Sequence, residues 1–427
     1  MPEQMARAAL GFGGGQTFDI PPFTVDEQLV GLLEESLSML GEEDGGSRAR
    51  VLGRLAVALY FTNDTERRAA LGREAVEMAT RVGDTGALAY ALSARRFALW
   101  GPETLDERLE VATKILQLAR SIGDRDLTLI GQRWRIVSLL ELGDIDAVKR
   151  QVEEYAVIAE ELKQPYQLWF AEVFRAMLAS LEGRLAEGET IGQRALTLGS
   201  SQQGENAVQF FAAQLMTIRE HQGRLLEMEP AIRAYAEQFP EILAIRAALA
   251  LIYALEGPAE DAREHFEIAA ANDFADLPRD TTWLLTLTML TQAAAALGDT
   301  PRAALLYDLF APYDSRTIVA GPAIVCHGSA AHYLGILAAT IGRTDDAARH
   351  FTDAIEMHER MGALPYLAHS LREYAGLASR SDAAADRERA SEMLGRALAL
   401  YQELGMTHFA TKTRAMQAAA GQGPGPR

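Results

Sequence analysis

The stretch GPAIVCHGSAAHYLGILAATIGRTDDAARHFTDAIEMHERMG, residues 321–362, decides the fold. It predicts two helices. The first is rich in small apolar residues and covers 323–341, and the second begins at Thr344 after a break at Gly342. Three residues share one face of the second helix at i, i+4, i+7 spacing, namely Ala347, Phe351 and Ala354. Such a hairpin cannot bury its apolar face alone, so the stretch predicts neighbouring hairpins of the same kind.

Turn glycines recur at intervals close to 40 residues. Glycines at positions 143, 183, 223, 257, 298 and 342 each end one predicted helix and precede another, with spacings of 40, 40, 34, 41 and 44 residues. Aromatic residues make up only 7% of the chain, and no sustained alternation of β-formers appears. The sequence therefore predicts an all-α fold, a right-handed α-solenoid of about 8–10 helical hairpins.

Composition divides the chain into three parts. Residues 1–24 hold a short Ala-rich piece, a glycine cluster and a Pro-Pro pair, which predicts a flexible N-terminal linker. The glycine cluster lacks a following Lys-Ser/Thr and a preceding strand, so it is not a phosphate-binding P-loop. Helical repeats are expected over residues 25–420, and the tail GQGPGPR at 421–427 is expected to be disordered.

The overall charge and the cysteine content narrow the classes of partner and compartment. A formal net charge of −18 over 427 residues repels phosphate backbones, so we expect no direct contact with nucleic acid. The sequence contains no run of about 18 apolar residues, so we expect no membrane span, and its start shows no signal-peptide pattern. A single cysteine, Cys326, excludes an internal disulfide and fits a reducing, cytoplasmic location.

The hairpin that decides the fold resembles a tetratricopeptide repeat (TPR). Five residues occupy positions of the repeat's sequence pattern, namely Leu334, Gly335, Ala347, Phe351 and Ala354. Ala338 stands where the pattern has tyrosine, Glu359 stands where it has proline, and most repeats here exceed the usual length. Small residues beside one aromatic ring are what close helix packing requires. The resemblance implies a TPR-like fold.

Four further stretches carry a second resemblance, namely ALSARRFALWGPETLDERLE at 91–110, QRWRIVSLLELGD at 132–144, LPRDTTWLLTL at 277–287 and PYDSRTIVAGPA at 312–323. Through them the chain over about residues 45–410 resembles the C-terminal helical arm of STAND/AAA-type ATPase regulators, maltose-regulator-like or cyclase-linked. That family's arm implies signal sensing and partner docking. The chain itself contains no Walker A motif, so the resemblance implies an arm alone, as a fragment or a free-standing relative.

Arginines spaced by one repeat period form the first candidate site. Arg95, Arg135 and Arg175 lie 40 residues apart on successive first helices, and residues 84–140 carry a net charge of +1 within this acidic chain. Residues one period apart stack in a solenoid, so these guanidinium groups are expected to form a ladder suited to a carboxylate or phosphate. The alternative is structural ion pairing, for example of Arg175 with Glu172 one turn earlier.

A second candidate surrounds Cys326 and His327. On a helix these neighbours would point about 100° apart, and His332 follows His327 by five residues, a poor spacing for a shared metal. Buried lining is therefore favoured over catalysis or metal binding, and no metal, cofactor or catalytic residue is expected. Aromatic residues of first helices are either core or the lining of a groove that binds a peptide. The candidate contacts in these two groups are Tyr90, Trp134, Trp169, His327 and Tyr333.

These patterns favour a non-catalytic TPR scaffold that binds a partner protein, a peptide or a small anionic effector. In the leading interpretation it is the sensor arm of a signalling or transcription-regulating ATPase. The first alternative is a free-standing adaptor, similar to a chaperone, that binds peptides. The second is an enzyme with a site near His327, which lacks a recognisable acid/base pair or an activated nucleophile.

Overall fold

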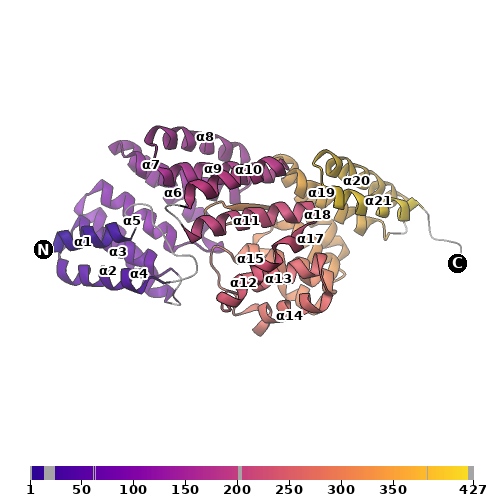
Figure 1. Ribbon diagram of the computed structural model, residues 1–427, viewed down its shortest axis with the longest axis horizontal. Helices are drawn as coiled ribbons and strands as arrows, with labels where there is room; N and C mark the ends of the chain where they lie inside the picture. The colour runs from indigo at the N-terminus through magenta and orange to yellow at the C-terminus, as the bar shows by residue number, and fades with distance from the viewer. Residues whose placement is uncertain are drawn as a thin grey trace. The chain divides into compact units, whose positions relative to one another are not determined.

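A computed structural model describes residues 2–13, 25–60, 62, 64–200, 204–381 and 383–421. α-Helices dominate these residues, and consecutive helices pack as hairpins, which confirms the expected all-α, TPR-like repeat architecture (Figure 1). Within the described ranges, none of the helices combines the length and the apolar character needed to cross a membrane. The chain divides into two compact units.

Unit 1 comprises Met1–Leu139, Ala147–Ala171 and Gln202–Asn206. Its first core forms where α1 and α2 pack on α3, and the next where α3 packs on α4 and α5. Its helices, of which the later ones extend past the unit boundary, are α1 (Pro2–Phe12), α2 (Glu27–Leu40), α3 (Gly46–Ala58), α4 (Thr65–Val82), α5 (Thr85–Ala98), η1 (Pro102–Thr104), α6 (Leu105–Ile122), α7 (Arg125–Glu141), α8 (Ile145–Leu162) and α9 (Pro165–Leu181).

Unit 2 comprises Leu140–Asp146, Glu172–Ser201 and Ala207–Arg427. Beyond α9 its elements are α10 (Leu185–Gly199), α11 (Glu205–Gln222), η2 (Leu225–Met228), α12 (Glu229–Gln238), α13 (Leu243–Glu256), α14 (Ala259–Ala269), η3 (Ala271–Phe274), α15 (Trp283–Leu297), α16 (Thr300–Phe310), η4 (Ala311–Tyr313), β1 (Thr317–Ala320), β2 (Val325–Ser329), α17 (Ala330–Thr340), α18 (Thr344–Met361), α19 (Leu364–Ala378), α20 (Ala384–Glu403) and α21 (Thr407–Gly421).

The hairpin of α17 and α18 packs as its sequence predicts. Ala347, Phe351 and Ala354 are all buried on α18. A β-carbon added to Gly335 of α17 would lie 2.6 Å from the Phe351 ring, so the glycine lets the two helices approach closely. The turn glycines behave consistently as well. Five of the six period glycines have positive φ, and the exception is Gly257, which is extended.

The first half of this stretch differs from the prediction. We expected a helix over 323–341, but α17 begins only at Ala330, and Val325–Ser329 forms strand β2. Strand β2 pairs antiparallel with β1, with Thr317 opposite Ser329 and Val319 opposite Cys326. Both strands are buried throughout, β1 against α15 and β2 against α17, α18 and α19. Cys326 and His327 therefore belong to a strand, and their side chains alternate between its two faces.

The N-terminal stretch expected as a linker also contains a helix. Residues 2–12 form α1, whose Ala6 and Ala9 are buried against α2 and α3. Alanine is the strongest helix former, which explains a helix in this Ala-rich piece. Residues 14–24, with Gly14 and Gly15 of the glycine cluster and the Pro-Pro pair, lie outside the described residues, as does 422–427.

Candidate functional site

The 40-residue period brings side chains of successive repeats into contact. In unit 1 the Trp134 indole N–H donates to Ser93 Oγ over 3.1 Å, a separation of 41 positions in sequence. In unit 2 the Gln214 side chain donates to the Val173 carbonyl over 3.0 Å, also 41 positions away. Residues one period apart therefore lie on neighbouring helices, which is the geometry on which the proposed arginine ladder depends.

The three arginines of the series differ in their partners. In unit 1, Arg95 of α5 forms an ion pair with Glu107 of α6 at 2.7 Å. In unit 2, Arg175 pairs with Glu172 at 3.1 Å, as the alternative from the sequence predicted. Both arginine side chains are about one-third exposed, 32% and 33%. These two guanidinium groups are therefore already neutralised by carboxylates.

Arg135, in the middle of the series, has a different environment. Its Nη1 donates to the Thr113 hydroxyl over 3.0 Å, and its Nε is buried without a hydrogen-bond partner among the described residues. No ion pair joins this guanidinium to a carboxylate in the described part of the chain. Arg135 is also the one half-buried position in a run of α7, residues 127–141, that is otherwise buried. It is thus a partly accessible cation with unused donors.

The arginines next to this series pack under aromatic rings, which the sequence analysis did not anticipate. Arg96 is fully buried, and its guanidinium lies 4.1 Å from the Trp134 ring and 4.9 Å from that of Trp100. Arg133 lies 5.0 Å from Trp134 and donates to the Tyr166 hydroxyl over 2.8 Å. Cation–π contacts of this kind stabilise a desolvated guanidinium. The signal in the sequence is an arginine that lies either next to a tryptophan or about one repeat period away from one, as Arg133 and Arg96 do relative to Trp134.

The aromatic candidates are core residues. Tyr90, Trp134, Trp169 and Tyr333 expose 3% or less of their surface. The hypothesis that they line an open groove is therefore wrong for this conformation, because no partner can reach these rings without a rearrangement. His327 is buried as well, at 6% exposure.

Unit 2 gathers five of the chain's eight histidines around Tyr366 and Ser370 of α19. They come from five different elements, and all except the half-buried His369 are buried. The five are His221 of α11, His327 of β2, His332 of α17, His358 of α18 and His369 of α19. His350, eight residues before His358 on α18, is buried as well.

Burial sets the protonation of this histidine cluster. Desolvation lowers the pKa of His327 and of His332 to about 4, and with the nearby His327 it lowers the pKa of His221 to about 3. Desolvation also lowers the pKa of His358 and of His369 well below the usual range. Burial raises the pKa of the Cys326 thiol to about 11. At neutral pH the cluster is uncharged and the thiol is protonated.

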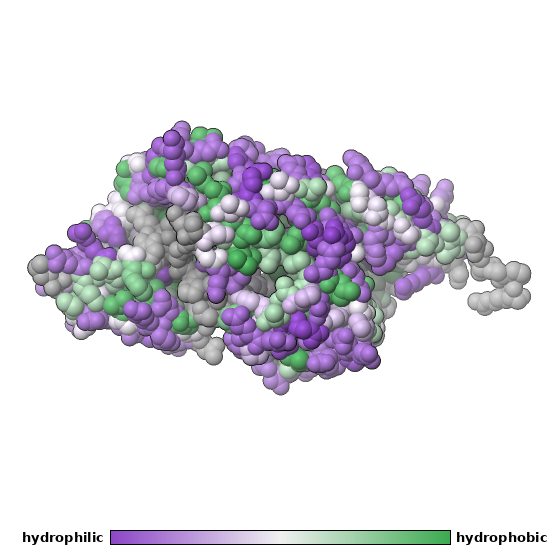
Figure 2. Space-filling model, viewed as in Figure 1, coloured by the Kyte–Doolittle hydropathy of each residue, from purple (hydrophilic) through white to green (hydrophobic). Residues whose placement is uncertain are grey.

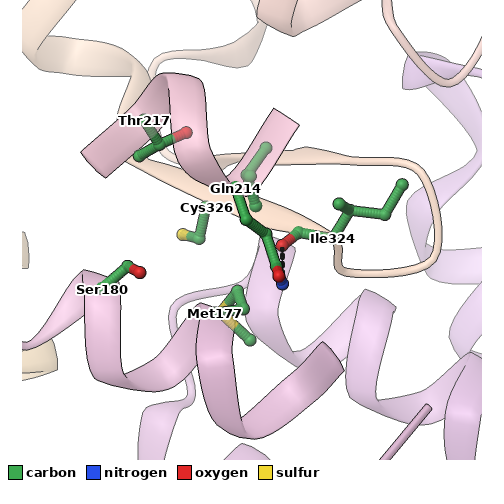
Figure 3. A pocket seen from close by; sticks show the side chains of 7 residues that line it. Met177, Ser180, Gln214, Thr217, Ile324 and Cys326 are labelled. Carbon is green, nitrogen blue, oxygen red and sulfur yellow. Dashed lines mark hydrogen bonds between the residues drawn. The ribbon is translucent and has the colours of Figure 1, made fainter. Parts of the chain in front are cut away.

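A small pocket adjoins the β-hairpin (Figure 3). It is lined by Met177, Ser180, Gln214, Thr217, Ile324, Val325 and Cys326. Within this lining, the side-chain amide of Gln214 donates to the Ile324 carbonyl over 3.1 Å, the contact drawn as a dashed line in Figure 3. Its cavity volume is about 10 Å³, which is enough for one water and too little for an organic ligand.

Metal binding finds no support in the described ranges, where no three His, Cys, Asp or Glu side chains are placed to hold an ion.

The exposed surface in Figure 2 is largely hydrophilic, with hydrophobic residues scattered among the polar ones. Large apolar side chains that are more than half exposed are Phe12, Val157 and Val208, on three different helices. The most exposed large apolar side chains are therefore dispersed over separate helices.

Three solved structures show distant similarity to the chain. A crystal structure of the APC/C hetero-tetramer Cut9–Hcn1 aligns at 12% identity and a TM-score of 0.40, covering 99% of this chain and 87% of that one. A structure of Naa15/Naa10 bound to HypK-THB aligns at 11% identity and 0.27, covering 99% and 74%. A circular tandem repeat protein aligns at 16% identity and 0.16, covering 99% and 94%. Values this low carry no argument about a partner or an activity. No family model and no curated protein matches the chain.

Proposed function

We propose that this chain is a non-catalytic TPR-like scaffold that binds a partner protein or peptide, or a small anionic effector, through a surface that includes Arg135. The observation that carries the proposal is the half-buried Arg135 guanidinium, which has no carboxylate partner in the described part of the chain. Repeat arrays in general present a long surface to partners, which is the usual basis of scaffolding.

The chemistry of the guanidinium defines the ligand class. Arginine presents a planar fork of N–H donors that matches the two oxygens of a carboxylate or a phosphate. In unit 1, Arg135 uses one donor on a neutral hydroxyl, whereas Arg95 is already paired with Glu107. An incoming anion therefore gains most at Arg135, where it displaces no existing ion pair.

The histidine cluster supports a non-catalytic interpretation. A general base must reach its substrate and titrate near the working pH. His327 and His332 are buried and have a pKa of about 4, and the buried Cys326 thiol has a pKa of about 11. The group that sequence analysis ranked as the best enzymatic candidate is therefore poorly suited to acid/base or nucleophilic work.

In the finer form of the proposal, the chain serves as the sensor arm of a STAND-type ATPase that regulates signalling or transcription in the cytoplasm. The alternative is a free-standing adaptor. The sequence resemblance over about residues 45–410 favours the arm. Reading the coding sequence upstream of Met1 separates the two, since an in-frame Walker A motif supports the arm and a start codon preceded by an unrelated gene supports the adaptor.

A thermal-shift experiment tests the binding proposal. The probes are ATP, pyrophosphate, citrate and an acidic pentapeptide, each titrated into the intact chain. A ligand at 100 times its Kd stabilises the folded state by about 2.7 kcal/mol, which raises the Tm by several degrees. We expect the shift from the best probe to vanish in Arg135→Gln while the Tm without ligand stays near that of the wild type.

Arg81→Gln is the matched control. Arg81 lies on α4 of the same unit, is 54% exposed and pairs with Asp44 at 2.7 Å, so its loss should leave binding unchanged. The proposal fails if no probe shifts the Tm, or if Arg135→Gln binds as the wild type does. It also fails if Arg135→Gln lowers the Tm strongly and leaves ligand affinity unaltered, because the arginine is then structural.

A further inference from the structure

We propose that unit 2 contains a proton-operated latch, in which His358 holds the β-hairpin of residues 317–329 closed and releases it on taking up a second proton. This proposal is independent of the binding function proposed for Arg135 in unit 1. It rests on the hydrogen bonds that fix the histidine tautomers and on the close packing of the hairpin backbone against the His358 ring.

The main contact of the latch joins the end of β2 to α18. The backbone N–H of Ser329 donates to His358 Nε2 over 2.8 Å. An atom that accepts from an N–H carries no proton itself, so the proton of neutral His358 lies on Nδ1. His358 Nδ1–H donates a hydrogen bond to Ser370 Oγ over 3.2 Å. The Ser370 hydroxyl in turn donates to His332 Nδ1 over 2.9 Å. The chain of donors runs in one direction from Ser329 to His332.

A second proton on His358 breaks this arrangement. It must attach to Nε2, where it would face the Ser329 N–H, so that two donors meet and neither has an acceptor. The ring is fully buried and closely packed, because His358 has no exposed surface and a β-carbon added to Gly328 would lie only 2.6 Å from its Nε2. Gly328 has a φ of +69°, a left-handed conformation that suits glycine at this close approach. The charged ring is therefore incompatible with the closed hairpin.

A second histidine anchors the other side of β2. Thr217 of α11 donates its hydroxyl to the Ala213 carbonyl over 3.1 Å, so its oxygen accepts from His327 Nε2 at 3.1 Å. His327 Nδ1 is then an unprotonated acceptor, buried and without a partner among the described residues. Opening the hairpin separates His327 from Thr217 and exposes it to water, so both histidines gain protons in the same step.

The groups that face His358 do not offset its charge at acidic pH. His332 of α17 and Tyr366 of α19 lie against the ring, and around these two lie His327 and Cys326 of β2 and His369 and the pair Arg372–Glu373 of α19. Arg372 and Glu373 lie 2.6 Å apart, so their charges largely cancel. From α11 come His221 and Glu220, and burial raises the pKa of Glu220 to about 7. Glu220 is therefore mostly protonated by pH 5.5, when a counter-charge would be needed.

The size of the effect follows from linkage. Desolvation lowers the folded-state pKa of both histidines, so the closed state is favoured above the ordinary histidine pKa and is lost as the pH falls below it. With an open-state pKa of about 6.5, one histidine raises the open population about tenfold between pH 7.5 and pH 5.5. Two histidines released together raise it on the order of 100-fold.

Cys326 is a built-in reporter, because it is the chain's single cysteine and lies buried on β2. The experiment follows its labelling by 4,4′-dithiodipyridine in the intact chain at pH 7.5 and pH 5.5, with far-UV circular dichroism recorded in parallel. Each rate is divided by that of glutathione at the same pH, which removes the ionisation of the thiol itself. We expect the normalised rate to rise on the order of 100-fold at pH 5.5 while the helical signal is retained.

His358→Gln is the test variant, because a glutamine amide can accept from Ser329 N–H and does not titrate. Its pH 5.5 to pH 7.5 ratio should fall to roughly 10, the contribution left from His327. His350→Gln is the matched control. His350 lies on the same helix, is buried, and its Nε2 contacts the Tyr307 hydroxyl at 3.0 Å rather than the hairpin, so it should keep the wild-type ratio.

Three results would overturn the latch. They are a wild-type ratio near 1, a folded His358→Gln variant with the wild-type ratio, and loss of the helical signal in step with labelling, which means global unfolding. If His358→Gln does not fold, hydrogen exchange of the wild type decides. Corrected for intrinsic rates, the protection of the Ser329 amide should fall on the order of 100-fold between the two pH values. Amides within 348–355 of α18 should keep theirs, and equal behaviour of the two regions contradicts the latch.

Discussion

Replacing Gly335 with alanine tests the helix packing that defines the repeat. The added β-carbon would meet the Phe351 ring at 2.6 Å, well inside van der Waals contact, and Phe351 is itself 1% exposed. Overpacking of this kind costs about 1–3 kcal/mol. Alanine in a helix interior recovers up to about 1 kcal/mol relative to glycine. We therefore expect Gly335→Ala to lower the free energy of unfolding of unit 2 by up to about 2 kcal/mol.

A double-mutant cycle shows whether the clash with Phe351 is the cause. Phe351→Ala alone leaves a cavity in the core and should cost about 3–5 kcal/mol. In the double variant the new methyl group at position 335 has lost the ring that it would strike and occupies part of that cavity. The double variant should therefore be more stable than the two single costs predict, by about 1–2 kcal/mol.

Urea unfolding followed by circular dichroism and by tryptophan fluorescence measures these differences. Trp283 lies in unit 2 and the other three tryptophans lie in unit 1, so the fluorescence transition contains both units and the change between variants is attributed to unit 2. Gly395→Ala on α20 is the matched control, since its added β-carbon meets nothing within 4 Å and should stabilise by about 0.5–1 kcal/mol. If Gly335→Ala proves as stabilising as Gly395→Ala, or if the cycle shows no coupling, the close contact with Phe351 is refuted.

Three further substitutions have defined outcomes. Glu220→Gln should stabilise unit 2 at pH 8, because burial raises the folded-state pKa of Glu220 to about 7 and its cost to folding accumulates as the pH rises from the ordinary glutamate pKa to that value; the gain should shrink as the pH falls from 7 towards the ordinary glutamate pKa in urea titrations. Asp84→Ala removes the cap of α5, where the carboxylate accepts from Ala87 N–H at 2.9 Å, and should cost about 1 kcal/mol at pH 7. Since the pKa of Asp84 is lowered, chiefly by this backbone hydrogen bond, that cost should fade in unfolding curves recorded below pH 4. Trp134→Phe leaves the buried Ser93 hydroxyl without its donor and should cost about 1–3 kcal/mol, measured by thermal unfolding.

The features that recur with the repeat could be predicted from the sequence, because each repeat packs its two helices against its neighbours in the same way. The small–aromatic–small register of Ala347, Phe351 and Ala354 follows from close helix packing, and the structure buries all three. The 40-residue spacing likewise predicted which helices are neighbours, and the contact between Trp134 and Ser93 follows it. The ion pair of Arg175 with Glu172 was predictable from local spacing alone.

The β-hairpin was missed because its signal is short. Strands β1 and β2 span only four and five residues, and both are buried on every residue. A fully buried strand lacks the alternation of polar and apolar residues, so periodicity cannot distinguish it from a buried helix. The one local clue is Ser329, whose side chain accepts from Ala331 N–H and thereby marks the start of α17.

The histidine cluster could be predicted only in part. His332 and Ser370 are 38 residues apart on successive first helices, so the repeat period indicates their contact. His221 and His369 are 148 residues apart, and their 3.4 Å contact depends on the path of several intervening helices. No local pattern encodes such a contact. The Thr217–His327 pair was hidden for another reason, since it requires β2, which the sequence analysis took for a helix.

The irregular repeat and the histidine cluster occur at the same place, and this coincidence has a physical explanation. The interval from Gly298 to Gly342 is the longest of the glycine series, at 44 residues. There α16 and α17 have only 11 residues each, against 18 in α18, and the hairpin occupies the chain between the two short helices.

A regular TPR-like hairpin buries its surface with small and aromatic side chains and needs no buried imidazole. Replacing helix with a buried strand brings backbone groups such as the Ser329 N–H into the core, where they require acceptors. Histidine supplies such an acceptor, but it can be protonated at mildly acidic pH. The insertion that interrupts the repeat is therefore also what makes unit 2 sensitive to pH.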